Sequence, residues 1–164
     1  MQFAKDSFYF ALRDRLAALN PARTVEVDGI VRTALVVWEN QARTTAVPQP
    51  AAFYLRFGGV RKVQAFAKAE RPLLAMECTI AYQTAGVTET GVDRGRLLST
   101  LDAELLQICV PPNTEKCDYT QTPTAALGTT VLWQAPQLEE AEGEGGYLRR
   151  RAQLSLYFFP EVDC

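Results

Sequence analysis

Two segments of the chain repeat apolar residues at helical spacing. Over residues 6–19 the apolar stripe is Phe8, Leu12, Leu16 and Leu19, and Asn20-Pro21 follows as a stop signal. In the second segment Asp93 stands where a helix N-cap is expected, and the apolar positions before Pro111 are Leu97, Leu98, Leu101, Leu105 and Ile108. The pattern predicts two amphipathic helices, one opening the chain and one past its middle.

Elsewhere apolar and polar positions alternate, which is typical of strands with one buried face. Strands are predicted over 53–57, 74–82, 127–135 and 147–158. The stretch from Thr24 to Trp38 is rich in β-branched residues and is interrupted by Asp28-Gly29, a turn that favours hairpins, so it is either two strands or one kinked strand. Residues 60–71 fit a strand extension or a short helix.

Three segments have the composition of loops. Pro48 and Pro50 interrupt residues 41–50, and residues 113–126 are rich in Thr and Gln with little apolar content. Residues 137–146 carry three glycines and four carboxylates, those of Glu139, Glu140, Glu142 and Glu144. This acidic segment is expected to be a mobile hairpin loop, because so polar and flexible a run has little to pack.

The order of predicted elements is α-β-β-β-β-α-β-β. Strands come in runs and do not alternate with helices, which disfavours a doubly wound fold. We therefore expect a single α+β domain over residues 1–164, with a mixed, mostly antiparallel sheet and both helices on one face. With 164 residues and 48 % hydrophobic content, the chain can form a core of its own.

Composition narrows the possible chemistry. The chain has no histidine, which removes the commonest general base, the commonest metal ligand and every dyad that pairs histidine with serine or cysteine. Its four cysteines form no Cys-x-x-Cys pair, and the glycines of residues 91–96 match neither a P-loop nor a dinucleotide fingerprint. Carboxylate, lysine, cysteine or tyrosine chemistry remains open to an enzyme, but no catalytic residue, no metal site and no cofactor site can be picked out from these residues.

Charge and hydropathy bear on partners and location. The formal net charge is −2, whereas domains that grip phosphate backbones are normally basic, so nucleic acid is disfavoured as a specific partner. Charged residues interrupt every window of signal-peptide length near the N-terminus, and no run of apolar residues is long enough to span a membrane. These observations predict a cytosolic protein that does not interact with membranes.

The densest basic cluster opens the last predicted strand. Arg149 and Arg151 are expected to point to the same side, opposite the apolar face, with Arg150 on the apolar side. Such a patch is either an ordinary solvated strand face or a contact with an acidic surface of a neighbouring subunit, for which the acidic segment is a candidate. Three aromatic residues are expected on the polar faces of their strands: Tyr54, Tyr157 and Phe159. They either contact a partner or form a second layer of core.

Three features together resemble the tail terminator, or tail completion, proteins of long-tailed bacteriophages. They are the opening amphipathic helix, the strand over 74–82 that leads into the leucine-rich segment 96–106, and the closing arginine-led strand over 148–158 that follows a long hairpin loop. The size of the chain and the order of its elements agree with that family over most of the sequence.

The resemblance implies a non-enzymatic structural protein of a virion or prophage. Such proteins form a ring, expected to be a hexamer, that caps the tail tube and joins the tail to head completion proteins. They are found in the host cytoplasm during assembly and then in the virion tail. The candidate subunit or tail contacts in this chain are Arg149, Arg151, Tyr157, Glu139, Glu140, Glu142 and Glu144. Two alternatives remain: another neck or tail tube component, and a small ligand-binding α+β domain.

Overall fold

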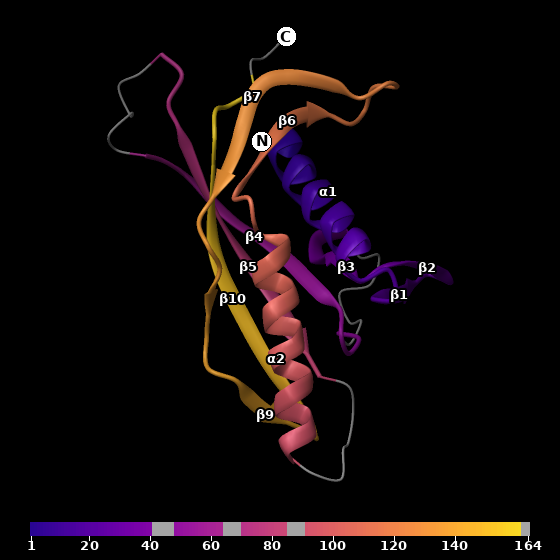
Figure 1. Ribbon diagram of the computed structural model, residues 1–164. Helices are drawn as coiled ribbons and strands as arrows, with labels where there is room; N and C mark the ends of the chain where they lie inside the picture. The colour runs from indigo at the N-terminus through magenta and orange to yellow at the C-terminus, as the bar shows by residue number, and fades with distance from the viewer. Residues whose placement is uncertain (41–47, 64–69, 85–90, 162–164) are drawn as a thin grey trace.

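A long, curled β-sheet forms the spine of the molecule, and two helices pack against it (Figure 1). The computed structural model describes residues 1–40, 48–63, 70–84 and 91–161, with no side-chain description for Asn40, Gly91 and Glu144. The order of strands across the sheet is β3-β4-β5-β10-β7-β6, and only the β3–β4 pair is parallel. The predicted α+β class, with a mixed and mostly antiparallel sheet, is confirmed.

The predicted helices and strands are present, and the structure adds strands that the sequence did not predict. The helices are α1 (Gln2–Leu19) and α2 (Gly91–Ile108), and a short 3-10 turn covers Trp38–Asn40. The main strands are β3 (Leu35–Val37), β4 (Phe53–Lys62), β5 (Leu74–Gln83), β6 (Asn113–Asp118), β7 (Ala125–Trp133) and β10 (Tyr147–Phe158). The question over 60–71 is settled as a strand extension as far as Lys62, while residues 64–69 lie outside the described ranges. Of the predicted loop over 41–50, residues 41–47 also lie outside the described ranges.

Helix α1 buries three of the four residues of its predicted stripe, but Leu19, in its last turn, is exposed. Ala4, Phe8, Leu12 and Leu16 recur every four residues and are fully buried. Helix α2 buries Leu98, Leu101, Leu105 and Ile108, but Leu97 is exposed, which corrects its predicted place in the stripe. Asp93 is also not the N-cap: the helix begins at Gly91, so Asp93 lies in the first turn, where a carboxylate still favours the helix dipole.

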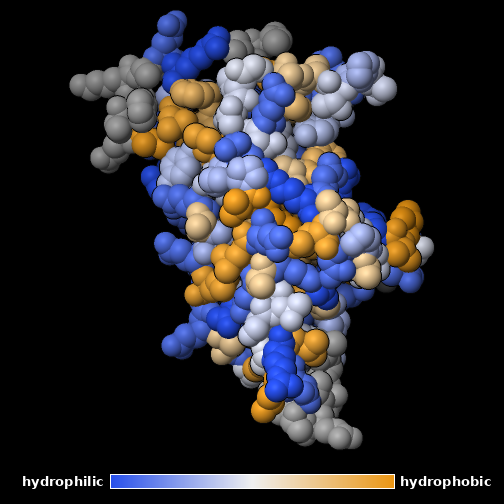
Figure 2. Space-filling view, viewed as in Figure 1, coloured by the Kyte–Doolittle hydropathy of each residue, from blue (hydrophilic) through white to orange (hydrophobic). Residues whose placement is uncertain are grey.

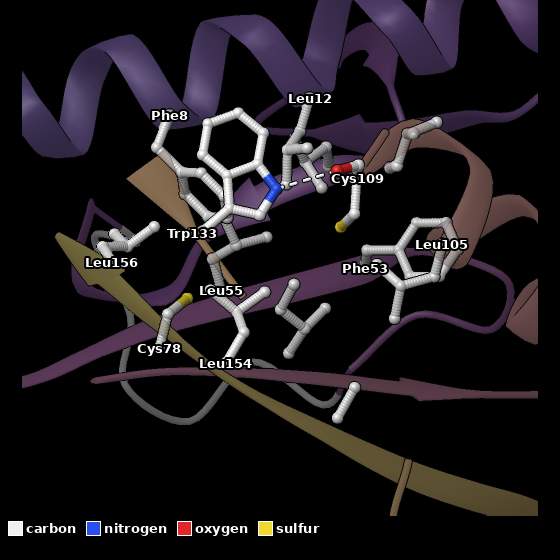
Figure 3. Close-up of a cluster of buried hydrophobic side chains, with 14 of the residues drawn as sticks. Phe8, Leu12, Phe53, Leu55, Cys78, Leu105, Cys109, Trp133, Leu154 and Leu156 are labelled. Atoms are coloured by element: carbon white, nitrogen blue, oxygen red, sulfur yellow. Dashed lines mark hydrogen bonds between the residues drawn. The ribbon is translucent and has the colours of Figure 1, made fainter. Parts of the chain in front are cut away.

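The main core lies between the two helices and the inner face of the sheet (Figure 3). The ring of Phe8 packs edge-on against Trp133 with 5.1 Å between centroids, and the Trp133 indole N–H donates to the Cys109 carbonyl at 2.9 Å. Cys78 and Cys109 are buried core residues, as predicted. Burial raises the pKa of the Cys109 thiol to about 12, so the thiol stays protonated at neutral pH.

The acidic segment is not the free loop that the sequence predicts. β8 (Gln137–Leu138) and β9 (Glu142–Glu144) both pair with β10, and β7 pairs with β10 farther along the same strand. Residues 125–144 therefore act as one interrupted strand, which turns into β10 through Gly145 and Gly146, both at positive φ. The backbone ladder supplies the order that side-chain packing does not.

The prediction of a loop over residues 113–126 is also wrong, because β6 occupies its first half. The inward positions of β6 are polar: Lys116 and Asp118 are buried there, so the hydrophobic alternation that marks a strand is missing. Tertiary contacts satisfy both side chains. The Lys116 amine donates to the Phe159 carbonyl at 2.9 Å, and Asp118 accepts from Thr120 and Gln121.

Residues 24–38 form two strands of a separate hairpin and then β3. The hairpin strands are β1 (Thr24–Val27) and β2 (Ile30–Thr33), joined by Asp28 at φ 53° and Gly29 at φ 77°, as a tight hairpin turn requires. A second, smaller core lies beneath the hairpin and contains Val25, Ala34, Val36, Ala52 and Tyr54. Tyr54 is thus part of a second core layer and not an exposed aromatic.

An ion pair clamps the segment after α1 to α2. The Arg23 guanidinium donates to both oxygens of the Glu104 carboxylate at 2.8 Å, and the Asn20 amide donates to one of them. Both charged side chains are more than four-fifths buried. Burial alone would raise the pKa of Glu104, but the bonds from Arg23 and Asn20 and the Arg23 charge lower it below its ordinary value.

We expect Glu104→Gln to lower the free energy of unfolding at pH 7 by about 2 kcal/mol, between the effects of breaking an exposed and a fully buried pair. A carboxyl with a lowered folded-state pKa contributes stability above its unfolded pKa, and that contribution is lost as pH falls through the folded value. The difference between the wild type and the variant should therefore shrink towards about pH 3. Urea titrations at both pH values measure it, and a pH-independent difference would contradict the assignment.

Candidate functional site

The three arginines that open β10 lie in three different environments. Arg149 lies opposite Gln83 of β5 and Glu142 of β9, and its Nε donates to the Gln83 side-chain oxygen at 2.8 Å. Gln83 is itself buried. Arg151 is on the same side of the strand and is exposed. The structure thus confirms their shared face, but Arg149 is anchored to the sheet while Arg151 is open to solvent.

Arg150 points to the opposite side, towards α2, and belongs to a largely buried polar cluster. Its Nε lies 3.0 Å from an Asp102 carboxylate oxygen, and its Nη1 donates to the Glu139 carbonyl at 2.5 Å. The Tyr82 hydroxyl donates to the same Asp102 oxygen at 2.5 Å. Burial and that hydrogen bond raise the pKa of Tyr82, so the phenol is a neutral donor. This cluster joins β5, β10 and α2.

The four glutamates of the acidic segment lie along the edge of β10. Glu139 is half-buried and accepts a 2.5 Å hydrogen bond from the Gln153 amide. Glu140 and Glu142 are exposed, and the backbone of Glu142 lies opposite that of Arg149. Glu144 ends β9 opposite Tyr147, and its side chain is outside the described part of the chain. The acidic segment and the arginine strand are thus paired through their backbones within one chain, and the predicted contact with a neighbouring subunit stays a prediction.

The outer face of β10 ends in an apolar patch. Tyr157 is half-buried and lies opposite Leu132 of β7, whose side chain is 47 % exposed. Phe159 follows β10 and is 39 % exposed. Of the three aromatics predicted on polar faces, Tyr157 and Phe159 are available for contact and Tyr54 is not.

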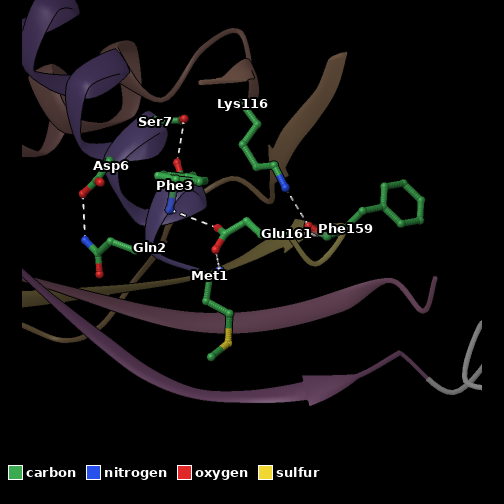
Figure 4. Close-up of polar contacts among 8 residues, drawn as sticks. All are labelled: Met1, Gln2, Phe3, Asp6, Ser7, Lys116, Phe159 and Glu161. Carbon is green, nitrogen blue, oxygen red and sulfur yellow. Dashed lines mark hydrogen bonds and ion pairs between the residues drawn. The ribbon is translucent and has the colours of Figure 1, made fainter. Parts of the chain in front are cut away.

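A groove that the sequence analysis missed lies between the first turn of α1 and the residues that follow β10; we name it the terminal groove. It has a volume of about 870 Å³, and its lining includes Phe3, Arg71, Lys116, Leu127, Phe159 and Glu161. Glu161 anchors its floor: one carboxylate oxygen accepts from the Phe3 backbone N–H at 3.0 Å, and the other pairs with the N-terminal amine of Met1 (Figure 4). A carboxylate here is favoured by the dipole of α1.

The polar groups of the terminal groove come from segments far apart in the sequence. The Lys116 amine is buried; burial lowers its pKa, and the charge of Glu161 opposes that effect. The Thr129 hydroxyl, also in the lining, is buried without a hydrogen-bond partner among the described residues. Sequence reasoning found none of this, because no local motif links residues 3, 71, 116, 129 and 161. The one signal in the sequence is Lys116, which lies in a segment whose apolar and polar residues alternate only weakly.

The β1–β2 hairpin is the second surface that sequence reasoning passed over. Ile30 is 61 % and Val31 is 66 % exposed, although both are β-branched apolar residues. Figure 2 shows apolar side chains projecting on the right of the molecule, where Figure 1 places this hairpin. Two such side chains in neighbouring positions on a projecting element are typical of a contact surface.

The described residues contain neither a metal-ligand cluster nor a membrane-spanning helix. No group of three or more cysteine, aspartate or glutamate side chains in the described ranges is arranged to hold a metal ion. No helix in that part of the chain is long and apolar enough to cross a membrane.

Comparisons with known proteins give a structural similarity and no family. No model of a known protein family matches the chain, and no curated protein matches it. Eleven chains of solved structures do match. One of them, whose name describes no function, has a TM-score of 0.48 and 13 % sequence identity, and the match covers 99 % of this chain and 97 % of that one. A similarity of this size says nothing about function.

Proposed function

We propose that this protein is a structural subunit of a phage or prophage tail, which forms a ring that caps the tail tube and joins the tail to head completion proteins. The proposal rests on the arrangement of β5, α2 and β10 at the centre of the fold. β5 leads to the leucine-rich α2, and the arginine-led β10 returns to pair with β5 over ten residue pairs. These are the elements on which the resemblance to tail terminators rests, in the same order.

The surface of a single chain supports self-association. Exposed apolar side chains gather on the β1–β2 hairpin and around Leu132 and Phe159, which lie on different elements. Contacts between two different patches of identical subunits are heterologous, and they close into a ring when the rotation per subunit permits. Arg151, Tyr157, Glu140 and Glu142 are the predicted contact residues that remain accessible for such a role. The expected site of action is the host cytoplasm during assembly and then the virion tail.

Sedimentation velocity over a range of protein and salt concentrations tests the proposal. We expect a ring-sized species, or a monomer that converts to one as concentration rises, and Arg151→Glu should weaken its formation and its joining to tail tubes. Arg149→Glu is a poorer test, because it also breaks the bond to buried Gln83. A strict monomer that also fails to bind isolated tail tubes would contradict the proposal.

Purified tail tubes separate the neighbouring alternative. A terminator adds to tube ends and stops, whereas another neck or tube component polymerises alone or binds elsewhere. Electron microscopy of the mixture distinguishes these outcomes.

The terminal groove favours a second candidate function, a ligand-binding domain. Its volume is in the range of small-molecule sites, and it brings cationic, anionic and apolar side chains together. A small molecule that binds the wild-type monomer but does not bind the Lys116→Met variant would support this candidate. A ring that forms without any ligand would favour the structural role.

A further inference from the structure

We propose that the β1–β2 hairpin of one subunit docks in the terminal groove of the next subunit. The inference rests on the proposed ring and names the two surfaces that would build it. The occupant of the groove is thus a second copy of this chain.

The strand register determines which hairpin side chains point outward. Val25 lies opposite Arg32 and Val27 lies opposite Ile30, so these four share the face that includes buried Val25. Glu26 lies opposite Val31, and both point away from the body of the molecule. The outer face therefore pairs an exposed carboxylate with a β-branched side chain that is two-thirds exposed. At the tip, Ile30 belongs to the other face but is also exposed, and Asp28 adds a second exposed carboxylate.

The terminal groove offers the complementary groups. Phe3, Leu127, Phe159 and Pro160 provide apolar lining, and the side chains of Leu127 and Phe159 are more than one-third exposed. The lining also contains two carboxylates, but Asp118 accepts from Thr120 and Gln121, and Glu161 pairs with the Met1 amine. The buried Lys116 amine donates to the Phe159 carbonyl, so the exposed Arg71 guanidinium is the cation of the lining that faces solvent and can meet a carboxylate of the hairpin. A segment with one or two carboxylates beside β-branched apolar residues fits this lining in charge and polarity, and the hairpin is such a segment.

The two surfaces lie at opposite ends of α1, so one chain cannot join its own hairpin to its own groove. The groove includes Phe3 in the first turn of α1, and the hairpin begins at Thr24, just after its end. A helix of 18 residues is about 27 Å long. A contact between hairpin and groove must therefore join different subunits, and it is heterologous, as a ring requires.

A charge exchange tests the contact within a single homomeric chain. Glu26→Arg and Arg71→Glu should each weaken self-association at least about tenfold, through repulsion across the interface. The double variant carries both exchanges in every subunit and should recover to within about threefold of the wild type. Glu77→Arg is the matched control, because Glu77 is exposed on β5 away from both surfaces, and it should change little.

Disulfide cross-linking tests the geometry directly. In a Cys117→Ser, Cys164→Ser background, Val31→Cys combined with Leu127→Cys should give a ladder of covalent multimers under oxidation. Each single-cysteine variant should give no species beyond a dimer. Sedimentation velocity on the same samples shows whether the cross-linked species is closed or open.

The outcomes separate this inference from the proposed function. A ring that forms without cross-linking, and whose charge exchange is not rescued, overturns the hairpin contact and leaves the ring intact. Cross-linked open fibres support the contact and contradict ring closure. If Val31→Asp abolishes tail-tube joining but leaves self-association unchanged, the hairpin binds the tube and the inference is wrong. A chain that is monomeric in every condition, never cross-links and does not bind isolated tail tubes overturns both.

Discussion

Phe8→Ala is expected to lower the free energy of unfolding by about 3–5 kcal/mol, the usual effect of removing a buried aromatic ring. Phe8 is fully buried, and its ring packs against Trp133 and, at 6.4 Å between centroids, against Phe57. It thus joins α1 to β4 and to β7, which lie on opposite sides of the central β5–β10 pair. Truncation would leave a cavity between rigid elements that cannot close around it.

Urea or guanidinium unfolding followed by tryptophan fluorescence measures the effect of Phe8→Ala. Phe10→Ala is the matched control, because Phe10 is only half-buried on the same helix and contacts Tyr119 and Arg13. We expect it to cost about 1 kcal/mol or less. If Phe8→Ala does not fold, Phe8→Leu, with most of the volume retained, should fold with a loss of about 1–2 kcal/mol. Equal effects at positions 8 and 10 would contradict the described packing.

Asp102→Ala is expected to have the next largest effect, a loss of about 3–5 kcal/mol, because it leaves a largely buried guanidinium without its counter-charge. Asp102 and Arg150 are 15 % and 21 % exposed, and Asp102 also accepts the Tyr82 hydroxyl. The variant therefore loses the ion pair with Arg150 of β10 and leaves the Tyr82 hydroxyl of β5 without its acceptor. The measurement is again equilibrium unfolding at neutral pH.

A double-mutant cycle shows whether the effect belongs to the pair. Asp102→Leu with Arg150→Leu replaces both charged groups with apolar side chains, and it should cost much less than the sum of the two single changes. Tyr82→Phe removes only one donor and should cost about 1 kcal/mol. If the loss in the double variant equals the sum of the two single losses, the side chains at positions 102 and 150 are not coupled.

The elements that the sequence predicted well are those whose periodicity matches their burial. Helix α1 and strand β10 each bury one face, and their apolar residues recur with the period of that face. The Asp28-Gly29 turn was readable for a different reason, since both residues adopt positive φ there and few residue pairs do so readily. In these places local chemistry and the final structure require the same thing.

The missed elements are those in which distant partners replace local signals. β6 has buried Lys116 and Asp118 where a strand normally has apolar residues, and its backbone edge is covered by α1, whose Ser7 hydroxyl accepts from the Cys117 N–H. β9 is too polar to be predicted as a strand, yet it pairs with β10. A ladder needs only a backbone partner, and the sequence does not show where that partner lies.

By itself, the sequence determined the α+β class, both helices, the central strands and the shared face of Arg149 and Arg151, because each follows from periodicity along one segment. Only the tertiary structure decided that Arg149 is bound to Gln83 while Arg151 is free to solvent, and that Tyr54 is buried. It also formed the terminal groove from residues near positions 3, 71, 116 and 161. The physical reason is that burial and charge pairing depend on which segments meet in space, and that is a property of the whole fold.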